Sequence, residues 1–107
     1  MAAVMKSKLS VGRMRAAAEE ATAALRALAN EDRLLLLCEL SRGERSVSEL
    51  EERLDIRQPT LSQQLGVLRN EGLVQTRREG KFIHYSVADR KALALLDTLY
   101  DLYCTAD

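Results

Sequence analysis

Residues 46–87, SVSELEERLDIRQPTLSQQLGVLRNEGLVQTRREGKFIHYSV, decide the fold of this chain. Apolar residues first recur at helical spacing over residues 47–54 and 59–70, two short segments joined by a four-residue turn. The period then changes to two over residues 73–78 and 82–87, which predicts two strands joined by the turn Glu79-Gly80-Lys81. Two short helices followed by a β-hairpin predict a winged helix-turn-helix, whose second helix lies in the major groove of DNA.

Local signals indicate where these two helices begin. Ser46 and Glu49 have the spacing of a capping box, in which each side chain accepts a hydrogen bond from the other residue's backbone N–H. Pro59 suits the first position of the second helix, where its missing N–H costs nothing. The leucines expected on the buried face of that helix are Leu61, Leu65 and Leu68.

Three further helices are predicted outside this unit. An alanine-rich helix spans residues 13–29, Asn30 caps a leucine-rich helix that ends at Gly43, and a last helix runs from Asp89 to about Tyr103. Residues 1–12 show no clear period and are expected to be flexible. The expected fold is therefore mainly α (α+β), with about five helices and a two-stranded β-hairpin wing in one domain of residues 13–107.

The second helix of the pair carries side chains suited to reading DNA. Gln bonds adenine through two contacts, and Ser or Thr bonds a base or meets a thymine methyl group. The contact residues predicted for this segment are Gln58, Thr60, Ser62, Gln63, Gln64 and Arg69. At the hairpin, Arg77, Arg78 and Lys81 are expected to contact phosphates, which supply affinity and position rather than specificity.

The distribution of charge supports this interpretation better than its total does. The formal net charge is zero, so bulk charge indicates no nucleic-acid partner, but residues 57–81 contain five basic and two acidic residues. Polar helix faces are usually solvated, so each feature alone is weak and the ordered combination carries the prediction. A winged-helix module that binds protein rather than DNA stays open as an alternative.

Composition and length argue against several other classes of function. The chain has 107 residues, one histidine and no Gly-rich phosphate loop, so neither an enzyme active site nor a cofactor is expected. The first residues lack the apolar core of a signal peptide, and no run is long enough to span a membrane. A cytoplasmic location is expected, where thiols are kept reduced.

Two cysteines, Cys38 and Cys104, flank the predicted DNA-reading unit within the segments LLLLCEL and LYDLYC. A free cysteine on a leucine-rich helix is usually a small buried hydrophobe, which is the plain interpretation of Cys38. Cys104 lies three residues from the end of the chain, where residues are usually exposed. A bond between the two in the cytoplasm would be transient and sensing rather than a permanent cross-link.

The run ALANEDRLLLLCEL together with residues 46–87 resembles the ArsR-type (ArsR/SmtB) bacterial repressors, over about residues 16–104. The segment RQPTLSQQLGVLRNEGLV is specific to this class rather than to winged helices at large. The resemblance implies a homodimer, with the first and last helices at the interface. It also implies repression of transcription by binding an imperfect palindrome in double-stranded DNA, whose two half-sites match the two-fold symmetry of the protein.

The family's usual metal-sensing residues are incomplete here. The paired cysteines of the arsenic and cadmium sensors are reduced to Cys38 alone, and no histidine follows Asp89 on the last helix. No metal site of those kinds is expected. Cys38 and Cys104 instead match the BigR/SqrR/HlyU branch, which implies that persulfides or polysulfides link the two cysteines and release DNA. A metal-responsive repressor with the two thiolates as ligands stays open as the alternative.

Overall fold

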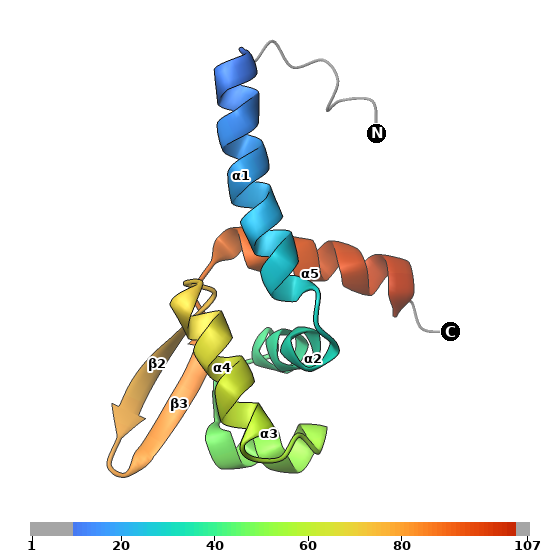
Figure 1. Ribbon diagram of the computed structural model, residues 1–107. Coiled ribbons are helices and arrows are strands. Elements are labelled where there is room, and N and C mark those ends of the chain that lie inside the picture. Colours follow the sequence, from blue (N-terminus) through green and yellow to red (C-terminus); the bar gives the residue numbers. More distant parts are fainter. Residues whose placement is uncertain (1–9, 105–107) are drawn as a thin grey trace.

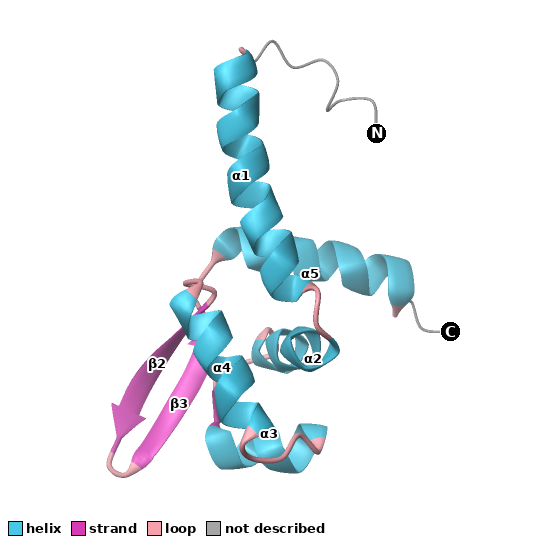
Figure 2. Ribbon diagram, viewed as in Figure 1, coloured by secondary structure: helices cyan, strands magenta, loops and turns pink. Residues whose placement is uncertain are grey.

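The computed structural model describes residues 10–104, which form five helices and three short strands (Figure 1, Figure 2). The helices are α1 (Val11–Leu28), α2 (Glu31–Leu40), α3 (Val47–Leu54), α4 (Thr60–Asn70) and α5 (Arg90–Tyr103). The strands are β1 (Arg45–Ser46), β2 (Val74–Glu79) and β3 (Phe82–Val87). Figure 1 shows α2, α3 and α4 gathered beside the hairpin, while α1 extends away from them. The predicted winged helix-turn-helix is confirmed.

Leucines from α2, α3 and α4 fill the centre of the domain. The largest fully buried side chains are Leu36, Leu37, Leu50, Leu61, Leu65 and Leu68. Complete burial of one leucine contributes about 1.5–3 kcal/mol relative to exposure, so this cluster holds the three helices firmly together. The last three leucines confirm the buried face predicted for α4, and the opposite face of that helix therefore points outwards.

Side-chain caps begin α2, α3 and α5 where the sequence predicts them. The side-chain oxygen of Asn30 accepts a hydrogen bond from the Arg33 backbone N–H at 3.0 Å. At α3 the Ser46 N–H donates to the Glu49 carboxylate at 2.8 Å, while the Glu49 N–H donates to the Ser46 hydroxyl at 3.3 Å. Asp89 caps α5 in the same way as Asn30 caps α2. These caps satisfy N–H groups that a helix leaves unpaired, and so fix its first turn.

Two helices begin at residues other than those predicted. The first predicted helix starts at Val11 instead of Arg13, because the Ser10 hydroxyl accepts a hydrogen bond from the Arg13 N–H and caps the chain earlier. Pro59 is the N-cap of α4 and not its first helical residue. Residues 1–9 of the expected flexible segment lie outside the described residues.

The β2–β3 hairpin confirms the predicted two-stranded wing, and a third strand that was not predicted joins it. β1 pairs antiparallel with β3, and β3 pairs antiparallel with β2, giving the order β1-β3-β2. Arg45 lies opposite Tyr85, and Ser46 lies opposite His84. A strand of two residues is too short to show an alternating pattern, so the sequence carried no signal for it. This pairing ties the loop after α2 to the wing.

The two terminal helices bury little of their apolar surface within the chain. Their buried residues are Ala27 and Leu28 on α1 and Ala92 and Leu96 on α5. Large apolar side chains that stay exposed on these helices are Val11, Met14, Leu25, Leu93, Tyr100, Leu102 and Tyr103. Apolar surface gathered on neighbouring elements in this way is typical of a protein–protein contact.

Candidate functional site

The outward face of α4 carries most of the polar residues predicted to read DNA. Ser62 and Gln63 are exposed, while Thr60 and Gln64 are half-buried. Gln58 lies before the helix, and its side-chain oxygen accepts a hydrogen bond from the Ser62 N–H at 3.1 Å. This bond occupies one of the N–H groups that the first turn leaves unpaired. In this structure Gln58 therefore supports the start of the reading helix.

Gln64 differs from its neighbour Gln63 in its surroundings. Its side-chain oxygen accepts a hydrogen bond from the Arg33 guanidinium on α2 at 2.9 Å. Gln63 is exposed on the outward face. The sequence pattern placed both glutamines among the predicted DNA contacts, but it gave no sign of Arg33, because helical periodicity says nothing of a contact between residues 31 positions apart.

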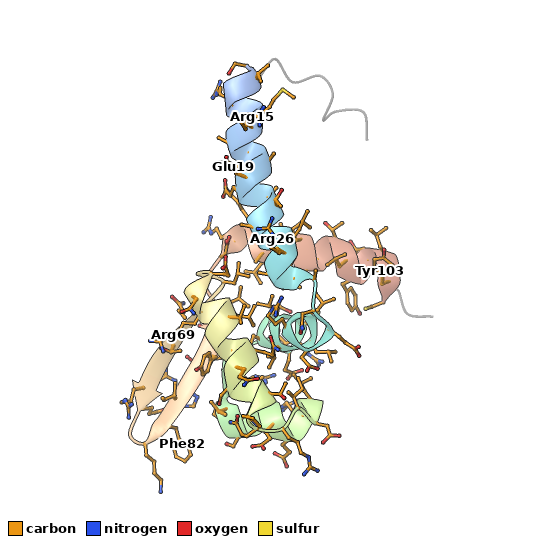
Figure 3. All side chains as sticks on the ribbon, in the orientation of Figure 1. Arg15, Glu19, Arg26, Arg69, Phe82 and Tyr103 are labelled. Atoms are coloured by element: carbon orange, nitrogen blue, oxygen red, sulfur yellow. The ribbon has the colours of Figure 1, made fainter. Side chains whose placement is uncertain are left out.

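The hairpin presents several exposed side chains beside the reading helix. Arg78 and Lys81 are exposed on the wing, and Arg69 is exposed near the end of α4. Phe82, which is 53% exposed, lies at the tip of the hairpin (Figure 3). Phe82 was not among the predicted contacts, although its position beside the turn at Gly80 was the available signal. The wing thus combines cationic and apolar groups at its outer end.

Arg77, the remaining basic residue predicted on the wing, is held by acidic neighbours. Its Nε and Nη2 donate to the two carboxylate oxygens of Glu44 at 3.0 and 2.7 Å, and Glu79 lies 3.6 Å away. The hydrogen bond from Arg77 is the main reason why the pKa of Glu44 lies below its ordinary value. His84 contacts the same Glu79 carboxylate at 3.3 Å. Arg77 therefore has less free charge to offer a phosphate than Arg78 has.

Glu44 is a residue that the sequence analysis missed. It precedes β1, and the pairing of β1 with β3 brings it next to β2. Because β1 left no pattern in the sequence, nothing indicated that Glu44 would meet Arg77 across 33 positions of the chain. A bidentate carboxylate–guanidinium pair is one of the stronger ion-pair geometries, although exposure to water weakens it.

The two cysteines are both free and both exposed. Cys38 lies in the last turns of α2, and Cys104 directly follows α5, where its N–H donates to the Tyr100 carbonyl oxygen at 2.8 Å. The plain interpretation of Cys38 as a buried hydrophobe is therefore wrong: the leucines at positions 36 and 37 face the core, and Cys38 is turned outwards.

Cys38 and Cys104 lie within electrostatic range of each other. Partial burial raises the pKa of the Cys38 thiol above its ordinary value, and the negative charge of Cys104 raises it further. Such an effect weakens with distance, so the fold brings two residues 66 positions apart in the sequence within range of each other's charge. Tyr103, at the far end of α5 in Figure 3, directly precedes Cys104 and is 80% exposed. Access, and not a lowered pKa, is what the structure offers the Cys38 thiol.

Residues 10–104 contain neither a group of metal-ligating side chains nor a helix that could span a membrane. No three side chains of His, Cys, Asp or Glu between residues 10 and 104 gather closely enough to hold a metal ion. In the same part of the chain, no helix combines the length and the apolar character needed to cross a membrane.

Comparisons with known proteins find close relatives. Residues 30–76 match the family described as "Bacterial regulatory protein, arsR family". The chain is 54% identical over 90 residues to the biofilm growth-associated repressor of Agrobacterium fabrum, covering 84% of this chain and 77% of that protein.

The chain is also similar to solved structures of bacterial regulators. The transcriptional repressor BigR from Xylella fastidiosa superposes with a TM-score of 0.84 at 45% identity, covering 92% of this chain and all of that one. Reduced HlyU from Vibrio cholerae also superposes with a TM-score of 0.84, at 40% identity, covering 89% of this chain and all of that one.

Proposed function

The chain belongs to the arsR family of bacterial regulatory proteins, and we propose that it is a cytoplasmic, homodimeric repressor whose release from operator DNA is triggered by reactive sulfur species at Cys38 and Cys104. Membership of the family, and similarity to the BigR and HlyU proteins, confirm the resemblance found in the sequence. These relatives are transcriptional regulators, and the chain is likewise a regulator and not an enzyme.

The exposed face of α4 supports DNA binding. Three buried leucines fix the helix on one side, which leaves its polar side free to enter the major groove. The wing then lies against the phosphate backbone beside it. The residues we propose to contact DNA or to support those contacts remain Gln58, Thr60, Ser62, Gln63, Gln64, Arg69, Arg77, Arg78 and Lys81.

The uncovered apolar faces of α1 and α5 support a homodimer. A two-fold contact would use the same patch on both subunits, and these helices offer exposed side chains such as Leu25, Leu93 and Leu102 for it. A two-fold dimer presents two copies of α4, which suits an imperfect palindrome whose half-sites lie about 34–36 Å apart.

The exposure of two free thiols, Cys38 and Cys104, within electrostatic range of each other is the observation that supports the sensing proposal. A thiolate attacks a sulfane sulfur of a polysulfide; in the simplest case, Cys–SH and HSSH give Cys–SSH and hydrogen sulfide. The second cysteine then attacks the bound persulfide, so that Cys–SSH and HS–Cys give Cys–S–S–Cys and a second hydrogen sulfide. In each step one sulfur of the S–S bond under attack is reduced and leaves as sulfide, while the attacking cysteine sulfur is oxidised. One further HSSH would add one sulfur atom to the bridge and release one further hydrogen sulfide.

The bridge would act on DNA binding through the helices that it joins. Cys38 is on α2, which belongs to the core that carries α4, whereas Cys104 ends α5, a helix of the proposed dimer contact. A bridge between α2 and α5 would change the orientation of each DNA-reading unit within the dimer. For release to follow, the bridged dimer must bind the operator less tightly than the reduced dimer does.

An operator-binding titration tests this function. An operator is first selected from random-sequence DNA with the reduced protein, and polysulfide is then added to the complex. We expect release from the wild-type protein and retention by Cys38→Ser and Cys104→Ser, which lack one end of the bridge. Release from either variant at the wild-type polysulfide concentration would refute the sensing proposal. A reduced protein that selects no DNA would refute DNA binding and favour a protein-binding module.

A metal-responsive regulator is the second candidate, because two free, exposed thiols are also ligands for soft metals. Such a site needs further ligands, which a second subunit would have to supply, since the described residues of one chain form no group of three. Titration of the same complex with Zn²⁺, Cd²⁺ or Hg²⁺ under reducing conditions distinguishes the two candidates. Release by a metal at stoichiometric concentration, with no response to polysulfide, would favour the metal.

A further inference from the structure

The guanidinium of Arg33 joins three separate helices. Arg33 lies in the first turn of α2, and its Nε and Nη2 donate to the carbonyl oxygens of Ala27 and Arg26 at 2.6 and 3.2 Å. These carbonyls are at the end of α1. The third nitrogen, Nη1, donates to the side-chain oxygen of Gln64 on α4 at 2.9 Å. One planar side chain thus connects the last turn of α1 to the middle of the reading helix.

The two ends of this connection have different surroundings. Ala27 is buried, whereas residues 11–22 of α1 are exposed, so the end of α1 is anchored and the rest is free for a partner. Figure 3 shows Arg26 at this lower end of α1, near α5. On α4, Gln64 is half-buried and engaged, while its neighbour Gln63 is exposed. Arg33 therefore reaches from the base of a proposed dimer helix to the DNA-reading surface.

The chemistry of the contact limits what Gln64 does for DNA. A two-contact glutamine–adenine pair uses the side-chain oxygen as an acceptor and the side-chain amide nitrogen as a donor. In Gln64 that oxygen already accepts from a cation, and charge-assisted hydrogen bonds of this kind are stronger than neutral ones. Breaking it to read a base would leave a half-buried guanidinium with one donor unpaired. Gln63 carries no such restriction.

We propose that Arg33 is a positioning residue for DNA binding, which fixes α4 relative to α1, and that Gln64 serves as its acceptor and not as a base reader. The rigid fork of arginine suits this task because it holds three acceptors in one plane. A lysine would offer a single point of contact. This inference rests on the proposed function only in requiring that α4 binds DNA; it does not depend on the cysteines.

A double-mutant cycle tests the connection. Gln64→Met removes the acceptor at nearly constant shape, Arg33→Met removes the donors, and Gln63→Met is the matched control on the neighbouring exposed glutamine. We expect Gln64→Met to weaken operator binding about tenfold, or about 1.4 kcal/mol, with its melting temperature near that of the wild type. The double variant Arg33→Met/Gln64→Met should bind no more weakly than Arg33→Met alone. Losses for Arg33→Met and Gln63→Met should instead add.

A second pair of variants separates positioning from base reading and needs no change at Arg33. Gln64→Glu keeps an acceptor for Arg33, whereas Gln63→Glu introduces the same charge one residue away. Repulsion from phosphate lowers the affinity of both for any DNA, so the readout is the ratio of operator affinity to affinity for a non-specific duplex. We expect Gln64→Glu to retain this ratio and Gln63→Glu to lose it.

The results of these two experiments decide whether Arg33 positions α4 for DNA binding. Additive losses in the double-mutant cycle, or loss of the affinity ratio in Gln64→Glu, would overturn the proposal and make Gln64 a base reader. If Arg33→Met does not fold, the ratio measured with the two glutamate variants decides alone. A wild-type protein that selects no operator would instead refute the proposed function itself, and with it any role of Arg33 in DNA binding.

Discussion

The region from α2 to the wing and the two terminal helices differ in how completely they bury their own apolar surface. α2, α3 and α4 enclose six fully buried leucines, whereas exposed apolar side chains such as Leu25 and Tyr103 lie along α1 and α5. The first region is thus a closed scaffold that holds the polar face of α4 outwards. The terminal helices are open surfaces, whose apolar side chains stay uncovered within the chain. Cys38 belongs to the closed region and Cys104 to the open one.

This difference in burial indicates which part of such a small protein can respond to a regulatory signal. A well-packed core changes little in response to a small chemical signal, because close packing resists deformation. A helix held by few internal contacts moves more easily. A bond between Cys38 and Cys104 would join the two, so it would alter the open region without disturbing the scaffold that reads DNA.

Truncation of one leucine in each region gives the largest expected effect. Leu65→Ala should lower the free energy of unfolding by about 2–5 kcal/mol, because it leaves a cavity among fully buried leucines. Leu25→Ala, at a site 57% exposed, should leave the stability of the subunit within about 0.5 kcal/mol but weaken the dimer. Denaturant unfolding and sedimentation measure the two effects. An equal loss of subunit stability in both variants would contradict the difference in packing between the two regions.

The sequence predicted the local features of the region from α2 to the wing but not its long-range contacts, for a physical reason. Capping residues such as Ser46 and Asn30 act within one turn, and the leucines of α4 recur at helical spacing, so both leave a local pattern. Glu44, Arg33 and the short strand β1 act through partners about 30 or more positions away, which no local pattern encodes. The outward polar face of α4 was therefore foreseeable, while the contacts that restrain Gln64 and Arg77 were not.

Substitution of Gly66 by alanine tests how closely DNA approaches α4 at this position. A Cβ at this position would meet no protein atom within 4 Å. Alanine has the higher helix propensity, so Gly66→Ala should raise the free energy of unfolding by about 0.5–1 kcal/mol. If DNA approaches the helix closely here, the same variant binds its operator less tightly. Calorimetry and operator titration should thus give opposite signs, and a gain in both would place DNA away from Gly66.

The ion pair between Glu44 and Arg77 is expected to have a smaller effect on DNA affinity. Glu44→Gln removes the charge that holds Arg77, so affinity for non-specific DNA should rise severalfold and depend more steeply on salt. Glu52→Gln is the matched control, with the same change of charge on the exposed face of α3. Equal effects of the two variants would show that only net charge matters and that Arg77 is not a phosphate contact.

The smallest expected effect concerns the pH at which Cys38 ionises. Partial burial and the charge of Cys104 both raise the pKa of Cys38, so its reactive thiolate becomes abundant only as pH rises above the ordinary range of a thiol. Cys104→Ser removes the second cause and leaves the first, so the pKa of Cys38 should fall part of the way. Ultraviolet absorbance of the thiolate during a pH titration measures the shift. An unchanged titration would mean that the two cysteines do not interact.

The operator affinity of purified, bridged protein tests the central claim most directly. After polysulfide treatment and digestion with trypsin, peptides 34–42 and 92–107 should be joined, with a mass that gives the number of sulfur atoms in the bridge. We predict that protein bridged within one chain binds the operator at least tenfold more weakly than reduced protein, and that a thiol reductant restores the original affinity. Bridged protein that binds its operator as tightly as the reduced dimer would contradict the account.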